Sequence, residues 1–507
     1  MSIIKFLHKW LGILMAPLMI MWFISGYFMI FSGFPRVQKS TRWRLQQPLS
    51  SAETLEPLPT FDALQTAYAA YAAHSATDAA TNPATDPTTQ SRLTHITMEK
   101  NWQGQTTFLL SGDQGELKID AATLQPIGQQ PPTLSEIEAM TRLITAAPPI
   151  AVDTLTSLNQ WVPFGHRRGD LPFIKVRAAD DRQTTLYFSG TTGELLQQTD
   201  RGSRLLAGFG TIPHWLYIWQ IRQNVKVWIR LFIALGIIGC LMILSGLVLG
   251  IYRTVRCRRS GQKGWSPFRR KWYLLHHITG LLFGVVVLTW MFSGWMSLDR
   301  LPRSWTGDAP RAQLKALSKS QPIAPDSRID FATVLRSHPG SKRITYANYM
   351  GRDYYETESE SGVHYDMIES GGVAPLQLTG SEVLQYIKES RVGAEVTDTT
   401  LLTQYTRLYH PHPKGKRLPP LPALRVETAE GTTMYVALDT PKIKLDNRAT
   451  RLNGWAYSKL HSFNFLWGYK HPTLWLSVML ILLTGGTLVS ISGGVLGFKA
   501  LRRKFRR

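Results

Sequence analysis

Residues 231–250 read LFIALGIIGCLMILSGLVLG, twenty successive positions without a charged side chain. Runs of the same kind recur along the chain, so that no Asp, Glu, Lys or Arg occurs in residues 10–35, 231–252, 272–298 and 471–498. The hydrocarbon core of a bilayer is about 30 Å thick and needs about 20 apolar residues per helix. The sequence therefore predicts four transmembrane helices and excludes a purely soluble protein.

The four spans leave two long segments, each large enough for a folded module, and two short basic ones. The predicted boundaries are transmembrane helices at 6–34, 227–252, 272–298 and 471–498, α+β modules at 35–226 and 299–470, a basic loop at 253–271 and a basic tail at 499–507. Residues 75–92 are rich in Ala, Thr, Asp and Pro and poor in apolar side chains, so we expect a flexible loop there.

Local patterns predict the elements of the modules. The predicted elements are helices at 61–73 and 134–146 and strands at 95–98, 106–110, 175–177, 185–188, 424–426 and 433–436. Thr133 and Glu136 have the spacing of a capping box at the start of the second helix. An interfacial helix is predicted within residues 212–230. Arg222, Lys226 and Arg230 recur every four positions, which places them on one helical face, with apolar and aromatic side chains on the other.

The net charge of +22 arises from 57 Lys and Arg against 35 Asp and Glu. Most of the excess lies before the first span, in residues 253–271 and in residues 499–507, three segments that contain no acid. These segments share one side of a four-span protein, and the positive-inside rule assigns that side to the cytoplasm. We therefore expect both termini in the cytoplasm, both modules outside, and membrane lipid rather than nucleic acid as the partner of these charges.

Cysteine is scarce, with Cys240 in a predicted span and Cys257 in the basic loop. Two such residues exclude a disulfide framework, a cysteine-ligated zinc site and a cysteine-ligated iron–sulfur cluster. The sequence also lacks C-x-x-C-H, which excludes covalently attached haem.

The two halves of the chain match each other at fixed offsets. At an offset of 268, the matches are His8 with His276, Gly12 with Gly280, Trp22 with Trp290, and Ser25-Gly26 with Ser293-Gly294. At an offset of 247, they are Arg204 with Arg451, His214 with His461, Trp228 with Trp475, and Ser245-Gly246 with Ser492-Gly493. The pattern predicts a tandem duplication whose copies pack about an axis along the membrane normal.

Four of the thirteen histidines are matched in this way and lie at the ends of spans. Ionisable groups at such places are usually functional. A b-type haem needs two axial imidazoles and an apolar slot, and the Ser-Gly pairs of the same layer can leave a flat gap for a porphyrin. We therefore expect two b-type haems, an inner one held by His8 and His276 and an outer one held by His214 and His461.

Other interpretations of these residues stay open. One histidine at an interface can be an amphipathic anchor, Ser-Gly pairs can serve helix packing, and a haem bound within each copy would pair the histidines differently. His277 and His471 are reserve ligands. Arg204 and Arg451 could pair with haem propionates, but they could equally be solvated or bind phosphate headgroups.

Further histidines and aromatic residues lie in the modules. His410 and His412, separated by a proline, could bind a metal, although two histidines in a Pro-rich loop are more often only a loop. Trp161 and Tyr409 could line a substrate face.

These features together resemble the PepSY-associated transmembrane proteins. The resemblance rests on H-x-x-x-G opening the first and third spans, Ser-Gly near their ends, the hairpin with Leu186-Tyr187, and the histidine before the next span, and it covers nearly the whole chain. That family includes reductases of the bacterial inner membrane that bind b-type haem and reduce ferric iron or ferric siderophores in the periplasm. The resemblance implies the same location and chemistry here, with the four matched histidines as ligands of haem iron.

The preferred hypothesis is a transmembrane haem reductase that acts on periplasmic Fe(III) or a ferric siderophore and releases Fe(II) for uptake. No G-x-G-x-x-G follows a predicted strand and the cytoplasmic parts are short, so the electron donor is expected to be a quinol or a separate reductase. The alternatives are a non-enzymatic, membrane-anchored binding module and a siderophore permease. One span would suffice for an anchor, and charge-free spans offer a permease no polar path.

Overall fold

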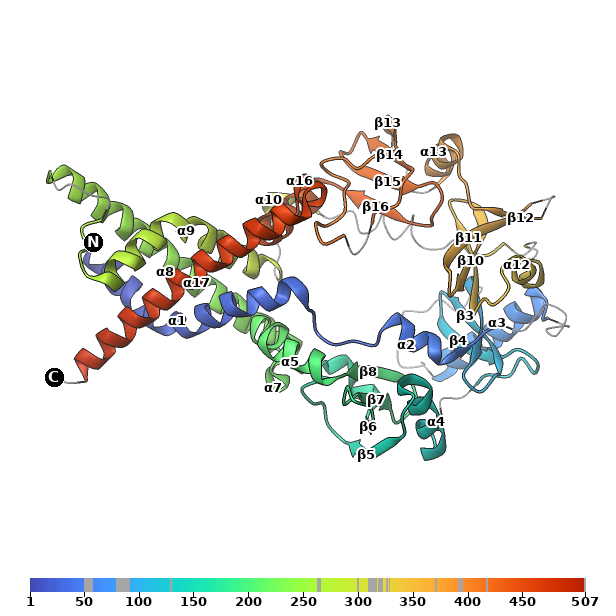
Figure 1. Ribbon diagram of the computed structural model, residues 1–507. Coiled ribbons are helices and arrows are strands. Elements are labelled where there is room, and N and C mark those ends of the chain that lie inside the picture. Colours follow the sequence, from blue (N-terminus) through green and yellow to red (C-terminus); the bar gives the residue numbers. More distant parts are fainter. Residues whose placement is uncertain are drawn as a thin grey trace.

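Four long apolar helices form a bundle in the computed structural model of the chain (Figure 1). They are α1 (Ser2–Phe31), α8 (Val225–Arg259), α9 (Lys271–Met296) and α17 (Pro472–Lys504). Their length and composition suit a membrane crossing, so the prediction of four spans is confirmed and the chain is a multi-pass membrane protein. The structure describes residues 1–507 apart from 50–57, 79–91, 128–129, 262–265, 299–300, 309–316, 318–321, 325–326, 328, 370–371, 391–394, 416–417 and 506–507.

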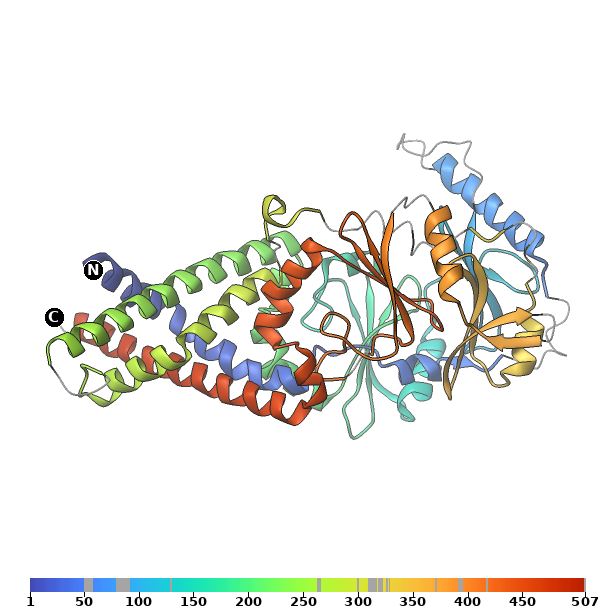
Figure 2. The same ribbon diagram turned by 90° about the horizontal axis from the view of Figure 1, so that it is seen from above.

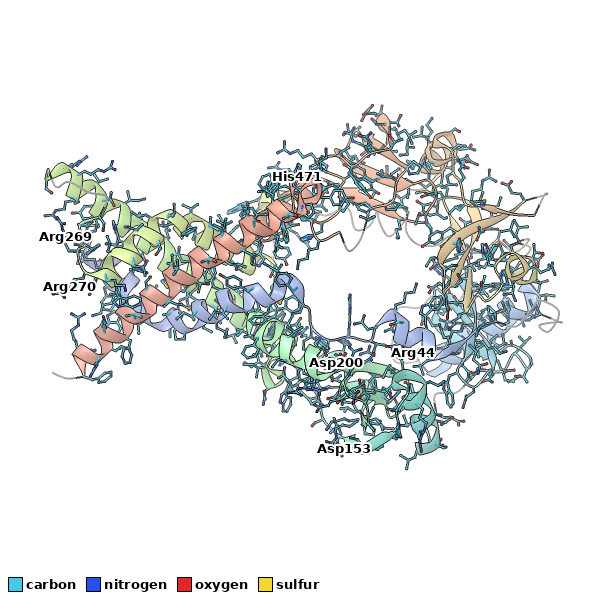
Figure 3. The ribbon with its side chains drawn as sticks, viewed as in Figure 1. Arg44, Asp153, Asp200, Arg269, Arg270 and His471 are labelled. Atoms are coloured by element: carbon cyan, nitrogen blue, oxygen red, sulfur yellow. The ribbon has the colours of Figure 1, made fainter. Side chains whose placement is uncertain are left out.

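Two of these helices run past their predicted ends. Residues 253–259 continue α8 and residues 499–504 continue α17, so the basic loop and the basic tail both begin as helix. Basic side chains occupy the last turn of each helix, where they stabilise it by interacting with the negative end of the helix dipole. Both termini lie at this end of the bundle, far from the strands (Figure 1). Arg269 and Arg270 lie at the same end (Figure 3).

The remaining described residues form an extramembrane region that is built mainly from strands. Those of the first half are β1 (Gln46–Gln47), β2 (Leu93–Asn101), β3 (Thr106–Gly112), β4 (Gly115–Asp120), β5 (Pro149–Leu155), β6 (Phe173–Ala178), β7 (Thr185–Ser189) and β8 (Leu195–Thr199). Those of the second half are β9 (Arg343–Tyr349), β10 (Arg352–Ser359), β11 (Gly362–Glu369), β12 (Gly372–Pro375), β13 (Val396–Leu402), β14 (Ala423–Thr428), β15 (Thr433–Ala437) and β16 (Ile443–Asp446).

Short helices connect these strands. They are α2 (Lys39–Arg44), α3 (Phe61–Asp78), α4 (Leu134–Thr145), the 3₁₀ helix η2 (Gly165–Asp170), α5 (Arg201–Phe209), α6 (Thr211–His214), α7 (Trp219–Arg222), α10 (Arg303–Thr306), α12 (Phe331–Ser337), α13 (Gly380–Glu389), α14 (Arg448–Gly454), the π-helix η3 (Trp455–Lys459), α15 (Leu460–Ser462) and α16 (Leu466–Lys470). α3 extends through the first part of the predicted loop at 75–92, so residues 75–78 are helical rather than loop, and residues 79–91 lie outside the described residues.

The two halves of the chain share one sheet, which the expectation of two separate modules did not include. Strands β1–β4 and β9–β12 form an antiparallel sheet of eight strands in the order β12-β11-β10-β9-β2-β3-β4, with β1 also paired to β2. The join is the antiparallel pair β2 and β9, in which Ile96 lies opposite Tyr346 and Met98 lies opposite Ile344. Strands from distant parts of the chain therefore pair directly.

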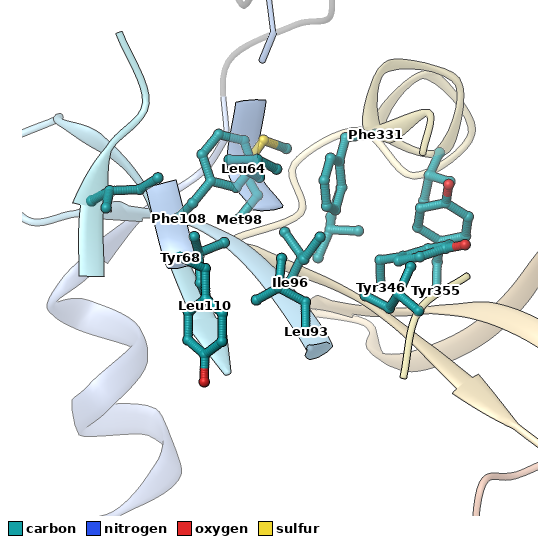
Figure 4. Close-up of a cluster of buried hydrophobic side chains, with 14 of the residues drawn as sticks. Leu64, Tyr68, Leu93, Ile96, Met98, Phe108, Leu110, Phe331, Tyr346 and Tyr355 are labelled. Carbon is teal, nitrogen blue, oxygen red and sulfur yellow. The ribbon is translucent and has the colours of Figure 1, made fainter. Parts of the chain in front are cut away.

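A core of side chains from both halves supports this sheet (Figure 4). Ile96 and Phe108 from the first half and Ile344 from the second are fully buried. The rings of Phe108 and Phe331 lie 5.7 Å apart between centroids, which brings α12 of the second half onto strand β3 of the first. Burial of this apolar surface stabilises the join between the halves.

Each half also has its own four-stranded antiparallel sheet, in the order β5-β6-β7-β8 or β13-β14-β15-β16. The predicted hairpins are β6 with β7 and β14 with β15. α4 begins with the predicted capping box of Thr133 and Glu136, and α13 begins with another, formed by Thr379 and Glu382. Both sheets lie between the bundle and the shared sheet (Figures 1 and 2).

The predicted interfacial helix is wrong, because the backbone leaves the helical conformation twice within it. α6 ends at His214, and Leu216 has a left-handed backbone with φ of 49° before α7 and α8 begin. The side chain of Arg222 is not displayed on a cationic helix face, since its guanidinium lies 4.5 Å from the ring centroid of Trp228. Two short helices, α6 and α7, and the start of the long α8 therefore occupy the stretch predicted as one helix.

Candidate functional site

The four matched histidines form two pairs at different depths of the bundle. In the distal layer, far from the extramembrane region, His8 of α1 and His276 of α9 have ring centroids 6.1 Å apart. In the proximal layer, next to that region, His214 of α6 and His461 of α15 have ring centroids 6.2 Å apart. Each pair takes one histidine from each half of the chain, as the symmetry of the sequence suggested.

Serine hydroxyls hold the proximal pair through Nδ1. Ser25 Oγ donates to the carbonyl of Trp22 and lies 3.0 Å from His214 Nδ1, so the hydroxyl oxygen accepts the Nδ1–H. Ser293 Oγ likewise donates to the carbonyl of Trp290 and lies 3.0 Å from His461 Nδ1. Since Nδ1 carries the proton in both rings, the lone pair is on Nε2.

Backbone carbonyls hold the distal pair in the same tautomer. His8 Nδ1 donates to the Met242 carbonyl of α8 at 3.1 Å. His276 Nδ1 lies 3.2 Å from the Val489 carbonyl of α17 and 3.1 Å from Ser492 Oγ. A carbonyl can only accept, so Nδ1 is again the donor and Nε2 again carries the lone pair.

The Ser-Gly pairs contact the histidines, and Gly26 and Gly294 of the proximal layer also line a cavity beside them. Ser25 and Ser293 supply the hydrogen bonds of the proximal layer. Gly246 lets His8 approach α8, because a Cβ there would lie 2.5 Å from His8 Cε1. A Cβ at Gly493 would lie 3.0 Å from His276 Cε1. Each Ser-Gly pair therefore contacts a histidine of its own layer.

The backbone turns that carry the proximal histidines are built alike. Leu216 and Phe463, each two residues after a histidine, have left-handed φ values of 49° and 50°. Trp228 Nε1 donates to the Trp215 carbonyl at 2.8 Å, and Trp475 Nε1 donates to the Ser462 carbonyl at 3.0 Å. A tryptophan of the following span thus holds the residue directly after each proximal histidine. The matched tryptophans were visible in the sequence, but their partners were not.

His214 and His461 both line a cavity of about 380 Å³. Besides the two histidines, the extramembrane region contributes His412, Lys414, Tyr457, Ser458 and Ser462 to the lining. The bundle contributes the indole N–H groups of Trp22, Trp290 and Trp295, which have no hydrogen-bond partner among the described residues. The apolar lining also comes from the bundle and includes Met19, Phe23, Val287, Met291, Met479 and Leu483. A cavity of this size with apolar walls and a few polar groups is typical of a cofactor or ligand site.

The donor set fits the axial ligands of a haem. Two imidazoles bonded through nitrogen to opposite faces of one metal ion at about 2.0–2.1 Å have ring centres about 6 Å apart, which is the spacing in both layers. Metal-bound histidines almost always donate the other ring N–H to a carbonyl, carboxylate or similar acceptor. Burial lowers the pKa of His461 to about 4 and that of His214 to about 3, so both rings are neutral, as ligation requires.

Open space also accompanies the distal pair. Gly12 and Gly280 lie one helical turn beyond His8 and His276 and on the same helix faces. A Cβ at either glycine would meet no atom within 4 Å. The H-x-x-x-G spacing therefore leaves room beside each distal imidazole.

The reserve ligands lie elsewhere. His277 points its Nε2 toward α8, 3.3 Å from the Gly250 carbonyl and 3.4 Å from Thr254 Oγ1. His471 is exposed at the start of α17 (Figure 3) and does not line the cavity. The structure brings neither histidine between the members of a pair.

The arginines proposed as propionate partners do not reach the cavity. The Arg204 guanidinium donates to the hydroxyls of Thr185 and Thr199 and to the Gln183 carbonyl, all within the extramembrane region. Arg451 lies on α14 and is not among the described lining residues. Three oxygens of its own module therefore accept hydrogen bonds from Arg204, so its assignment as a propionate partner is wrong.

The remaining candidates are also placed. Tyr409 is only 2% exposed and stacks on Tyr435 at 4.7 Å, so it lines no open face, and the Trp161 ring stacks on Phe34. His410 Nε2 accepts from Lys459 Nζ at 3.0 Å. Among the described residues, no three His, Cys, Asp or Glu side chains gather as a metal site would require.

Comparison with known proteins places the chain in a family. No curated protein matches it. A family model described as the PepSY-associated TM region matches residues 6–496, which include all four histidines, the whole of α8 and α9, and most of α1 and α17. The chain therefore belongs to the family of the PepSY-associated TM region.

Proposed function

We propose that this protein is a transmembrane electron carrier that reduces ferric iron or a ferric siderophore with two b-type haems. His8 and His276 would be the axial ligands of one haem, and His214 and His461 those of the other. The observation that carries the proposal is that all four histidines donate from Nδ1 and leave Nε2 for a metal, in two pairs with the ring spacing of axial ligands.

The chain positions two redox layers across the membrane. The haems, when bound, supply one-electron oxidation and reduction. Two histidine layers divide a hydrocarbon core of about 30 Å into shorter steps. Residues 10–35, 231–252, 272–298 and 471–498 contain no Asp, Glu, Lys or Arg. The spans therefore have no charged side chain that would stabilise an ion between the two layers. One electron from the donor converts one Fe(III) to Fe(II) at the proximal side.

The distribution of Lys and Arg predicts the orientation of the protein in the membrane, and with it the direction of electron transfer. Positive charges gather at the distal end, which the positive-inside rule places in the cytoplasm, with the extramembrane region in the periplasm of a bacterial inner membrane. A quinol or a separate reductase would deliver electrons there. Reduction weakens the hold of hard oxygen ligands on iron and so frees Fe(II) for uptake. The paired geometry of the halves supports their origin by tandem duplication.

The visible spectrum of the purified protein, with haem counted per chain, tests the proposal. We expect two b-type haems in the parent protein and one in each variant in which a paired histidine becomes Ala, because one imidazole cannot hold a haem as two do. His8→Ala and His276→Ala should lose the same haem, and His214→Ala and His461→Ala the other.

His277→Ala and His471→Ala are matched controls, since neither side chain lies within a pair. Both should keep two haems. A parent protein without a reducible Soret band would contradict the proposal and favour a binding module or a permease. Four paired-histidine variants that all keep two haems would contradict the assignment of ligands.

A further inference from the structure

The proximal cavity has a charge at one end only. Among the described residues that line it, Lys414 is the one Lys or Arg, and Asp and Glu are missing from the lining. Lys414 is exposed, so this end of the cavity meets solvent. Burial, reinforced by the neighbouring Lys414, lowers the pKa of His412 to about 4, which leaves the ammonium of Lys414 as the charge at neutral pH.

The loop that bears Lys414 covers the proximal layer. Its His412 ring packs edge-on against Trp475 at 5.9 Å, and its Pro413 lies where a Cβ at Gly468 would touch it. Lys414 Nζ donates to the Met29 carbonyl at 3.0 Å, which ties the loop of the second half to the last turns of α1. The Pro-rich loop is thus a lid over the cavity mouth that spans both halves.

Two hydroxyl groups line the same cavity as the lysine. Tyr457 stacks on the His461 ring at 5.5 Å between centroids and lines the cavity. Ser458 Oγ accepts from Asn464 Nδ2 at 3.0 Å, which leaves its own O–H to donate. An ammonium carries a positive charge and three N–H donors, which suit an anionic oxygen ligand. This end of the cavity therefore gathers donors suited to carboxylates.

We propose that the loop at residues 410–414 binds the carboxylates of the proximal porphyrin, with Lys414 as the anchoring cation. The inference rests on the proposed function and adds the orientation of the group: its carboxylates face the extramembrane region and its apolar edge faces the middle of the bilayer. The reverse orientation would bury two carboxylates among Met19, Phe23 and Leu483, where the described lining offers neutral indole N–H groups but no positive charge to compensate their lost hydration. Lys414 replaces Arg204 and Arg451 in this role.

Two measurements on the full-length protein test the proposal. The first compares the affinity of haem-free protein for haem b and for its dimethyl ester, whose carboxylates cannot take a charge. We expect weaker binding of the diester at the proximal site of the parent protein, and a smaller preference for the free acid in Lys414→Gln, as a double-mutant cycle requires. The second measures both midpoint potentials, and Lys414→Gln should lower that of the proximal haem because a positive charge near it is lost.

Lys444→Gln is the matched control, since Lys444 lies in the same half of the extramembrane region, on β16, but donates to the Leu408 carbonyl and does not line the cavity. It should change neither measurement, and Lys414→Arg should restore both. If the parent protein binds two haems but shows no preference for the free acid, or if Lys414→Gln behaves as Lys444→Gln does, this proposal is wrong while the haem assignment stands. A parent protein that binds no haem overturns both proposals.

Discussion

At the residue scale, the two histidine layers use different acceptors for the same purpose. The proximal histidines donate from Nδ1 to side chains, Ser25 and Ser293, whereas His8 donates to a backbone carbonyl. His276 lies within reach of both a carbonyl and Ser492. A side-chain acceptor can be removed by substitution and a backbone carbonyl cannot. The layers should therefore respond differently to loss of a serine.

Ser25→Ala and Ser293→Ala should each weaken binding of the proximal haem by about 10–100-fold, the usual cost of losing the hydrogen-bond partner of a metal-bound histidine. Ser492→Ala should cost less at the distal site, because the Val489 carbonyl still accepts from His276 Nδ1. Haem dissociation followed in the visible spectrum measures the effect.

Ser297→Ala serves as the control, since Ser297 is exposed and its hydroxyl donates only to the Gly294 carbonyl among the described hydrogen bonds. Its dissociation rate should equal that of the parent protein. Equal rates for Ser293→Ala and Ser297→Ala would show that the serine acceptor is dispensable.

At the scale of elements, glycines set how closely the helices approach the distal histidines. α8 meets α1 where Gly246 faces His8, and α17 meets α9 where Gly493 faces His276. Deeper in the bundle, a Cβ at Gly486 of α17 would lie 2.1 Å from Phe23 Cε1 of α1. Close helix approach through small residues is common in membranes. Here it also fixes the position of the imidazoles.

Gly246→Ala should displace His8 and lower the occupancy of the distal haem, because the new Cβ would lie 2.5 Å from Cε1 and 2.9 Å from Nδ1 of that ring. The ring has little freedom to yield, since its Nδ1 is bonded to the Met242 carbonyl. Gly493→Ala should have a smaller effect at 3.0 Å. Haem content per chain and the low-temperature α band measure the outcome.

Gly494→Ala is the control on α17, because its Cβ would meet only the end of the flexible Ile20 side chain, at 3.2 Å, and the Ala16 Cβ, at 3.8 Å. Full haem content in Gly246→Ala would mean that α8 can move away from α1 without cost, against the packing described above.

At the scale of the whole molecule, the two halves are joined at both ends. Each histidine pair joins them inside the bundle, and strands β2 and β9 join them in the shared sheet. The core of that sheet mixes side chains of both halves, among them Phe108 and Phe331. The extramembrane region should therefore lose its structure as one unit across the join.

Phe108→Ala should destabilise the shared sheet by about 3–5 kcal/mol, the range for deleting a buried aromatic side chain, since Phe108 is 0% exposed. Hydrogen exchange should then accelerate in β9 and β10 of the second half as well as in β2 and β3. Leu134→Ala, at a residue that is 71% exposed, should change exchange little in either half. Faster exchange confined to β2–β4 would contradict a common unit.

Hydropathy and local pattern were enough to predict the spans, the hairpins β6–β7 and β14–β15, and the Thr133 capping box, because each depends on neighbouring residues. The same local patterns failed after Ile212, where Leu216 interrupts the helix with a left-handed backbone that leucine seldom adopts and that no sequence pattern predicts. The pairing of β2 with β9 was not predicted for a related reason, because it joins residues far apart in the chain.

The sequence alone determined that four histidines occupy matched positions at span ends, because the internal match of the two halves can be read from residue types. Only the tertiary structure decided how those histidines are used. The acceptor of His8 is the carbonyl of Met242, which every residue possesses, and Ser25 was recognisable but its partner, 189 positions away, was not. Lys414 reached the cavity for the same reason: folding, and not spacing, brings a distant loop to the end of α1.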